Sequence, residues 1–123
     1  MKFKVADLRY KEGNEKHFGW LEEELSKSAG RANLKTTGYL KPFFRLYESL
    51  RDRGMVNPLV CYGKNRRNPI VLIGNQRLCC ARALGWEEIE VVFAERRDHA
   101  NRHAIRYRQI GYDPAVDSWE MVP

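Results

Sequence analysis

Long apolar runs and cysteine-pair motifs are both missing from this sequence of 123 residues. No stretch approaches the roughly 20 consecutive apolar residues that a membrane-spanning helix needs, so we expect no membrane partner. The three cysteines, Cys61, Cys79 and Cys80, form no Cys-x-x-Cys pair, and adjacent residues of a helix point about 100° apart, which suits neither a disulfide nor chelation. We therefore expect small buried thiols in a reducing compartment, and a zinc site would lack ligands.

The sequence also lacks a secretion signal, internal repeats and low-complexity segments. Its first residues contain no apolar segment followed by a small-residue cleavage site, so we expect a cytoplasmic protein. A chain of this length can bury one hydrophobic core but not two. We predict a single domain over residues 1–123, with its core over residues 39–110 and an irregular tail over residues 112–123.

Basic residues outnumber acidic ones, 22 Lys and Arg against 16 Asp and Glu, which gives a formal net charge of +6. This excess favours a polyanionic partner, such as nucleic acid, a nucleotide, a phosphorylated substrate or an acidic protein surface. The net charge alone does not choose among these partners. The positions of the basic residues are more informative.

The spacing of apolar residues predicts two helices in the first half of the chain. Over residues 14–30 the apolar side chains recur at helical spacing, and Asn14 can cap the helix. Residues 40–53 place aromatic and leucine side chains on one face, and Gly54 stands where the helix would end. Between them, residues 30–38 are rich in turn-forming and basic residues and are expected to form a loop.

Three apolar segments predict strands, and a short edge strand is expected at residues 3–5. Residues 57–63 and 68–74 are β-branched apolar runs on either side of a basic connection, and residues 87–95 alternate apolar and polar side chains. The first two runs are nearly continuous, so both faces of the sheet should be covered there, and helices should supply the cover. Helices that alternate with strands in this way indicate an α/β or α+β fold.

The tetrapeptide Gly74-Asn75-Gln76-Arg77 joins the second apolar run to a predicted short helix over residues 76–84. The first amide N–H groups of a helix have no partner within it, and the helix dipole adds positive charge there. Gly74 allows close backbone approach, Asn75 can form a hydrogen bond, and Arg77 offers a bidentate guanidinium to phosphate or carboxylate oxygens. The segment therefore predicts a phosphate-binding turn; the alternative for Arg77 is a surface charge or an ion-pair partner.

Residues 46–93 contain an ordered series of short motifs. The residues that carry them are Leu46, Ser49, Leu50, Gly54, Pro58, Leu59, Gly74, Arg77, Ala81, Leu84 and Gly85. In this order they resemble the N-terminal domain of the ParB and sulfiredoxin superfamily. That family has a helix ending in Leu-x-x-Ser-Ile-x-x-x-Gly, a Pro-Ile-x-Val strand, a Gly-x-x-Arg signature that opens a helix, and Ala-x-x-x-Leu-Gly before the next strand. Cys61 stands here in place of the family's valine.

The resemblance implies an α+β fold, a small mixed sheet with helices packed against it, in which the Gly-x-x-Arg loop binds the phosphates of a nucleotide. Family members bind and hydrolyse CTP, use ATP, phosphorylate free serine or cleave nucleic acids. The candidate cofactor is Mg²⁺ with a nucleoside triphosphate. The residues that would contact phosphate or lie near the nucleotide, carried over by motif position, are Gly74, Asn75, Gln76, Arg77, Ser49 and Pro58.

Two departures from the family pattern bear on catalysis. At the position of Asn75, sulfiredoxins have their reactive cysteine, and partition proteins and serine kinases usually have glutamate. An amide is neither a general base nor a charged metal ligand. After the following strand, the partition proteins have a Glu-Asn-x-x-Arg pattern, of which only Glu95 is kept here as a candidate metal ligand. We therefore expect ligand binding with weak or no hydrolysis.

Residues 96–108 are the densest basic segment and are predicted to form a helix. This helix is either a solvated surface or a contact surface for phosphate or nucleic acid. His99 and His103 stand one helical turn apart, a spacing that suits a metal, but no third ligand is evident. The candidate contact residues in this segment are Arg96, Arg97, Arg102 and Arg106.

The preferred function is thus binding of a nucleotide or other phosphorylated ligand at residues 74–77. The alternative is a nucleic-acid-binding protein or nuclease that uses residues 96–108, with Glu95 and Asp98 as the only acidic pair beside them. A third is a protein-binding module in which the phosphate site is vestigial. The sequence leaves open whether the protein is an enzyme, which base it would prefer and how many copies assemble.

Overall fold

The computed structural model describes residues 1–28, 41–63 and 67–94. The loop predicted over residues 30–38, the helix over 96–108 and the tail over 112–123 lie outside these residues. None of the helices that the structure describes is long and apolar enough to cross a membrane. In chain order the elements are β1 (Lys2–Lys4), the 3₁₀ helix η1 (Val5–Asp7), α1 (Glu15–Ser28), α3 (Lys41–Arg53), β2 (Leu59–Tyr62), β3 (Ile70–Ile73), α4 (Asn75–Leu84) and β4 (Glu88–Phe93).

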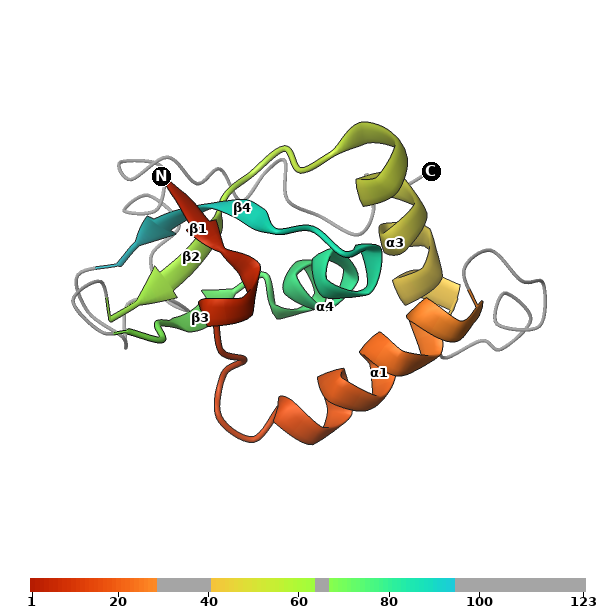
Figure 1. Ribbon diagram of the computed structural model, residues 1–123, viewed down its shortest axis with the longest axis horizontal. Helices are drawn as coiled ribbons and strands as arrows, with labels where there is room; N and C mark the ends of the chain where they lie inside the picture. The colour runs from red at the N-terminus through yellow and green to blue at the C-terminus, as the bar shows by residue number, and fades with distance from the viewer. Residues whose placement is uncertain (29–40, 64–66, 95–123) are drawn as a thin grey trace.

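The four strands form one mixed sheet in the order β1-β4-β2-β3. β2 is antiparallel to β3 and parallel to β4, and β1 is antiparallel to β4. Parallel neighbours cannot be joined by a tight turn, and the connection from β2 to β4 runs through β3 and α4 (Figure 1). A mixed sheet with helices packed against it is the α+β arrangement that the sequence predicts.

α1 and α3 each bury the apolar side that their sequence spacing predicts. Phe18, Leu21 and Leu25 of α1 and Phe44 and Tyr47 of α3 belong to the main core. α3 ends at Arg53, and the next residue, Gly54, has φ 76° and donates its amide to the Leu50 carbonyl (2.9 Å). That left-handed conformation favours glycine, which explains the sharp end of the helix.

α4 is the central helix of the fold and packs against both α1 and α3 (Figure 1). Leu78, Cys79, Cys80 and Ala81 are fully buried in it, and the small side chains let the neighbouring elements approach closely. All three cysteines are buried free thiols, as expected. Burial raises the pKa of Cys61 and of Cys79 to about 12, so both thiols stay protonated at neutral pH.

Both faces of the β2–β3 pair are buried, as the nearly continuous apolar runs predict. On one face, residues such as Leu59, Cys61 and Val71 join the helices in the main core. On the other face, Val60 and its neighbours form a second cluster, which among the described residues contains strand side chains and Ala94 only. Cover by helices is therefore confirmed for one face of the sheet.

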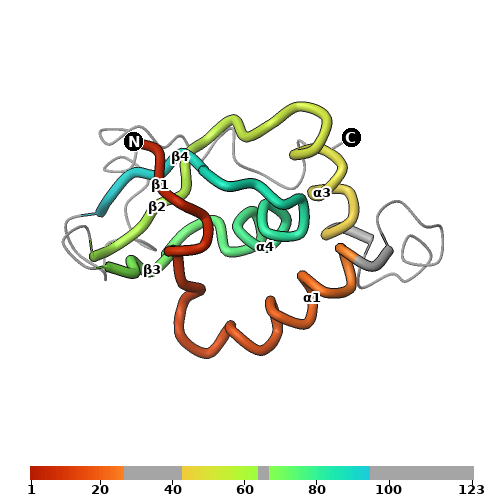
Figure 2. The backbone as a smooth tube through the Cα atoms, in the orientation of Figure 1, coloured from red at the N-terminus to blue at the C-terminus, as the bar shows by residue number. Residues whose placement is uncertain are grey.

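The N-terminal strap (residues 5–11) connects the two edges of the sheet. β1 pairs with β4 at one edge, and at the other edge Arg9 pairs with β3. The Arg9 amide donates to the Pro69 carbonyl (3.0 Å), and the Arg9 carbonyl accepts from the Val71 amide (2.8 Å). Figure 2 follows this segment from β1 past β3 into α1. The edge strand agrees with the strand predicted near residues 3–5, whereas no sequence pattern predicts the strap.

Candidate functional site at the β3–α4 junction

The junction (residues 73–77) passes from strand to helix through a single residue. β3 ends at Ile73, α4 begins at Asn75, and Gly74 between them has φ 104° and ψ 24°. The Leu78 amide donates to the Gly74 carbonyl (2.9 Å), so the helical hydrogen bonds begin there. The amides of the first turn therefore have no acceptor within the helix, and Gly74 supplies no side-chain cap. These amides are the backbone donors on which a phosphate site would depend.

Gly74 is required for space as well as for its backbone angles. A β-carbon at this position would lie 2.5 Å from Leu59 Cδ2 and 2.8 Å from Arg77 Nη2. The glycine of the Gly-x-x-Arg motif thus leaves room for the arginine one turn later. This relationship explains the spacing of the motif in this chain.

Arg77 points back from the helix into the protein. Its side chain is only 5% exposed. Nη1 donates to the Asn57 carbonyl (2.6 Å), and Nη2 lies 3.5 Å from the Pro58 carbonyl. The structure therefore brings Arg77 and Pro58 together, through the turn between α3 and β2 (residues 54–58). Direct contact of the guanidinium with phosphate remains a prediction.

Asn75 uses both ends of its amide inside the protein. Its Oδ1 accepts the Lys11 amide (3.0 Å), and its Nδ2 donates to the Val71 carbonyl (3.1 Å). The side chain is 7% exposed. Asn75 thus joins the strap to β3, which leaves its backbone amide as its contribution to a phosphate site.

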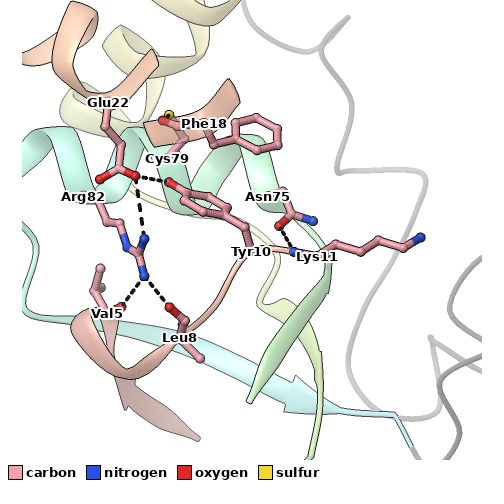
Figure 3. A network of polar contacts seen from close by, with 9 residues as sticks. All are labelled: Val5, Leu8, Tyr10, Lys11, Phe18, Glu22, Asn75, Cys79 and Arg82. Atoms are coloured by element: carbon pink, nitrogen blue, oxygen red, sulfur yellow. Dashed lines mark hydrogen bonds and ion pairs between the residues drawn. The ribbon is translucent and has the colours of Figure 1, made fainter. Parts of the chain in front are cut away.

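Lys11 is a basic residue beside the junction and is not among the site residues predicted from the sequence. Its backbone hydrogen bond to Asn75 holds it next to the first residue of α4. In Figure 3 its side chain extends on the side of Asn75 away from Arg82. No motif marks this lysine, because its place depends on a contact across 64 residues of sequence.

Two further predicted site residues lie on α4 and α3. Gln76 lies in the first turn of α4 and is partly exposed, and Ser49 is a partly exposed residue of α3. Within the described part of the chain, no group of three or more His, Cys, Asp or Glu side chains is arranged to hold a metal. The predictions for Glu95, Arg96, Arg97, Arg102 and Arg106 fall outside the described residues.

A second polar network fastens the strap to α1 and α4 (Figure 3). The Tyr10 hydroxyl donates to Glu22 Oε2 (2.6 Å), and Arg82 Nη1 lies 3.6 Å from the same oxygen. Arg82 Nη2 also donates to the carbonyls of Leu8 and Val5, and its guanidinium lies 4.8 Å from the Tyr10 ring centre. Burial, with the nearby Cys79 and Glu22, raises the pKa of Tyr10.

Solved structures with a similar fold were found by comparison with known proteins. No protein-family model and no curated protein matches the sequence. Among solved structures, the C-terminally truncated chromosome-partitioning protein ParB from Caulobacter crescentus, complexed with CTP-γ-S, superposes with a TM-score of 0.54 at 15% identity. The match covers 81% of this chain and 46% of that one, so this chain spans about half of the truncated ParB.

The ParB-N domain of a Pnob8-like protein also matches, at 16% identity and a TM-score of 0.41, over 82% of this chain and 31% of that one. The superposition on the Caulobacter protein covers 81% of this chain. The chain therefore has the fold of a ParB-like N-terminal domain.

Proposed function

We propose that the protein binds a nucleotide or another phosphorylated ligand at the N-terminus of α4, with weak or no hydrolysis. The observation that carries this proposal is the junction itself. A buried strand enters a ten-residue helix through one left-handed glycine that offers no side-chain cap. Backbone amides at such a helix start, together with the helix dipole, favour a bound anion.

The charges around the junction support the same ligand class. The first turn of α4 contains no acidic residue, Arg77 lies behind it, and Lys11 lies beside it. Positive charge on two sides of the helix start favours phosphate over a neutral ligand. The similar ParB structure contains CTP-γ-S, which supports a nucleoside triphosphate as the first ligand to test.

Weak or absent hydrolysis follows from the chemistry of residue 75. The partition proteins and serine kinases that this chain resembles usually have a glutamate there, whereas Asn75 is uncharged and both ends of its amide are already hydrogen-bonded. It therefore cannot accept a proton from an attacking water. We also propose Glu95 as a ligand of a Mg²⁺ ion that accompanies the nucleotide. The candidate contacts to phosphate or nucleic acid are Arg96, Arg97, Arg102 and Arg106.

The experiment measures binding of the four common ribonucleoside triphosphates and of inorganic tripolyphosphate by calorimetry, with and without Mg²⁺. Gln76→Glu places a carboxylate in the first turn of α4, where it stabilises the helix through the dipole but repels a bound phosphate. We expect this variant to fold at least as well as wild type and to lose about tenfold or more in affinity.

Gln76→Lys is the opposite variant, and we expect it to bind the same ligands more tightly. Gln76→Ala is the control for loss of the amide side chain and should bind nearly as wild type. The proposal fails if wild type binds none of the five compounds. It also fails if Gln76→Glu and Gln76→Lys bind with equal affinity.

A further inference from the structure

We infer that Arg77 is a positioning residue that selects for the nucleoside part of the ligand. In this role it fixes the α3–β2 turn against the phosphate site and does not itself bind phosphate. This inference rests on the proposed function. It distinguishes the phosphate-binding amides of α4 from the α3–β2 turn, which would contact the nucleoside.

The first support is where the guanidinium lies. Its Nη1 makes a 2.6 Å hydrogen bond to the Asn57 carbonyl, and the side chain is 5% exposed. Nη2 would be only 2.8 Å from a β-carbon on residue 74, so the group lies directly behind the junction backbone. The guanidinium is therefore already bound to a backbone carbonyl of the α3–β2 turn and shielded from solvent where it lies.

The second support is the cost of moving the guanidinium. A buried guanidinium that leaves its carbonyl partners would leave those carbonyls unsatisfied, and unsatisfied buried polar groups are costly. Among the described residues, no buried side-chain nitrogen or oxygen lacks a hydrogen-bond partner. Arg77 is therefore more stable where it is than reaching around Gly74 to a ligand.

The third support is an exposed apolar side chain on the α3–β2 turn that Arg77 holds. Val56 immediately precedes the Asn57 carbonyl that Arg77 binds, and it is 74% exposed, the highest value among the large apolar side chains that the structure describes as exposed. An exposed apolar side chain on a turn fixed to the phosphate site is suited to contact a nucleobase. Arg77 therefore sets the distance between the turn and the phosphate-binding amides.

The test compares a ligand that has a nucleoside with one that has the triphosphate chain alone. The dissociation constants of the best-bound ribonucleoside triphosphate and of inorganic tripolyphosphate are measured for wild type, Arg77→Lys and Arg77→Gln. We expect both variants to weaken nucleotide binding by about tenfold and to change tripolyphosphate binding by less than about twofold. The dissociation constant of the nucleotide divided by that of tripolyphosphate therefore rises in both variants.

Other roles of Arg77 leave this ratio unchanged. If the guanidinium contacts phosphate, both affinities fall by the same factor. If it only stabilises the fold, neither affinity of the folded protein changes. Either result overturns the inference but leaves the proposed function intact, whereas a wild type that binds neither compound overturns both.

Two further variants control the comparison. Arg82→Lys removes another guanidinium of α4 that donates to backbone carbonyls, but those carbonyls belong to the strap, so the ratio should stay at the wild-type value. Pro58→Gly loosens the same turn while keeping the guanidinium and the backbone carbonyl of residue 58 that it approaches, and should raise the ratio. If the Arg77 variants do not fold, an unchanged ratio in Pro58→Gly overturns the inference.

Discussion

The Tyr10 hydroxyl donates a 2.6 Å hydrogen bond to Glu22, and this bond joins the strap to α1. Glu22 also pairs with Arg82, so three elements meet at one carboxylate. Hydrogen bonds to charged groups contribute more than neutral ones. The strap is therefore held by a side-chain contact as well as by its pairing with β3.

Tyr10→Phe should lower the free energy of unfolding by about 1.5 kcal/mol, the lower value for a hydrogen bond to a charged group, because Glu22 is partly exposed. Urea denaturation measures the change. In a Glu22→Gln background the same substitution should cost less, since the acceptor is no longer charged. Equal costs in the two backgrounds would contradict a charge-assisted bond.

Gly74→Ala should be strongly destabilising, by about 3 kcal/mol, because a left-handed backbone and a steric overlap act together. Gly13→Ala is the matched control. Gly13 has a similar φ of 88°, but a β-carbon there would meet nothing within 4 Å. It should cost only the backbone strain of about 1–2 kcal/mol. Thermal denaturation that ranks the two variants equally would show that Leu59 and Arg77 do not crowd Gly74.

Gly19→Ala should stabilise the protein by about 0.5–1 kcal/mol, the gain expected for alanine over glycine inside a helix. Gly19 lies within α1 and beside a hollow of about 360 Å³ between this helix and the strap. A β-carbon there would meet nothing within 4 Å, so the substitution adds no overlap. A lower melting temperature for this variant would contradict the open space.

Stability should decline in alkaline solution. The folded protein raises the pKa of Cys61 and Cys79 from 9.0 to about 12 and also raises that of Tyr10. The fold thus favours the protonated thiols, and their contribution is complete below pH 9 and is lost as pH rises from 9 to 12. Each thiol should reduce stability by about 1.4 kcal/mol per pH unit in that range.

Urea denaturation between pH 8 and pH 11 tests this expectation. The Cys61→Ala variant should show a shallower pH dependence than wild type, even though its stability at pH 8 is lower. Thiolate absorbance from the folded protein at pH 9.5 would contradict the raised pKa values.

Much of the fold could be predicted because its signals are local. The apolar spacing of α1 and α3, the left-handed glycine after α3 and the β-branched runs of β2 and β3 each lie within a few residues of sequence. The strap could not be predicted in this way. The pairing of Arg9 with β3 uses backbone groups separated by about 60 residues, and such pairing leaves no periodic pattern.

In the candidate site, too, some features have local sequence signals and others depend on distant residues. The glycine and the start of the helix could be recognised from residues 73–77. The direction of Arg77 could not, because an arginine in a first turn can reach outward or fold back. That choice depends on the Asn57 and Pro58 carbonyls, 20 and 19 residues away. The place of Lys11 likewise depends on Asn75, 64 residues later.

β1 has its partner at the far end of the described chain, where Phe3 pairs with Ile89. During synthesis on a ribosome, about 85 further residues must emerge before that strand can form its hydrogen bonds. β1 therefore stays without this partner in the nascent chain until β4 has emerged. β4 pairs with both β1 and β2, so its emergence completes the four-stranded sheet.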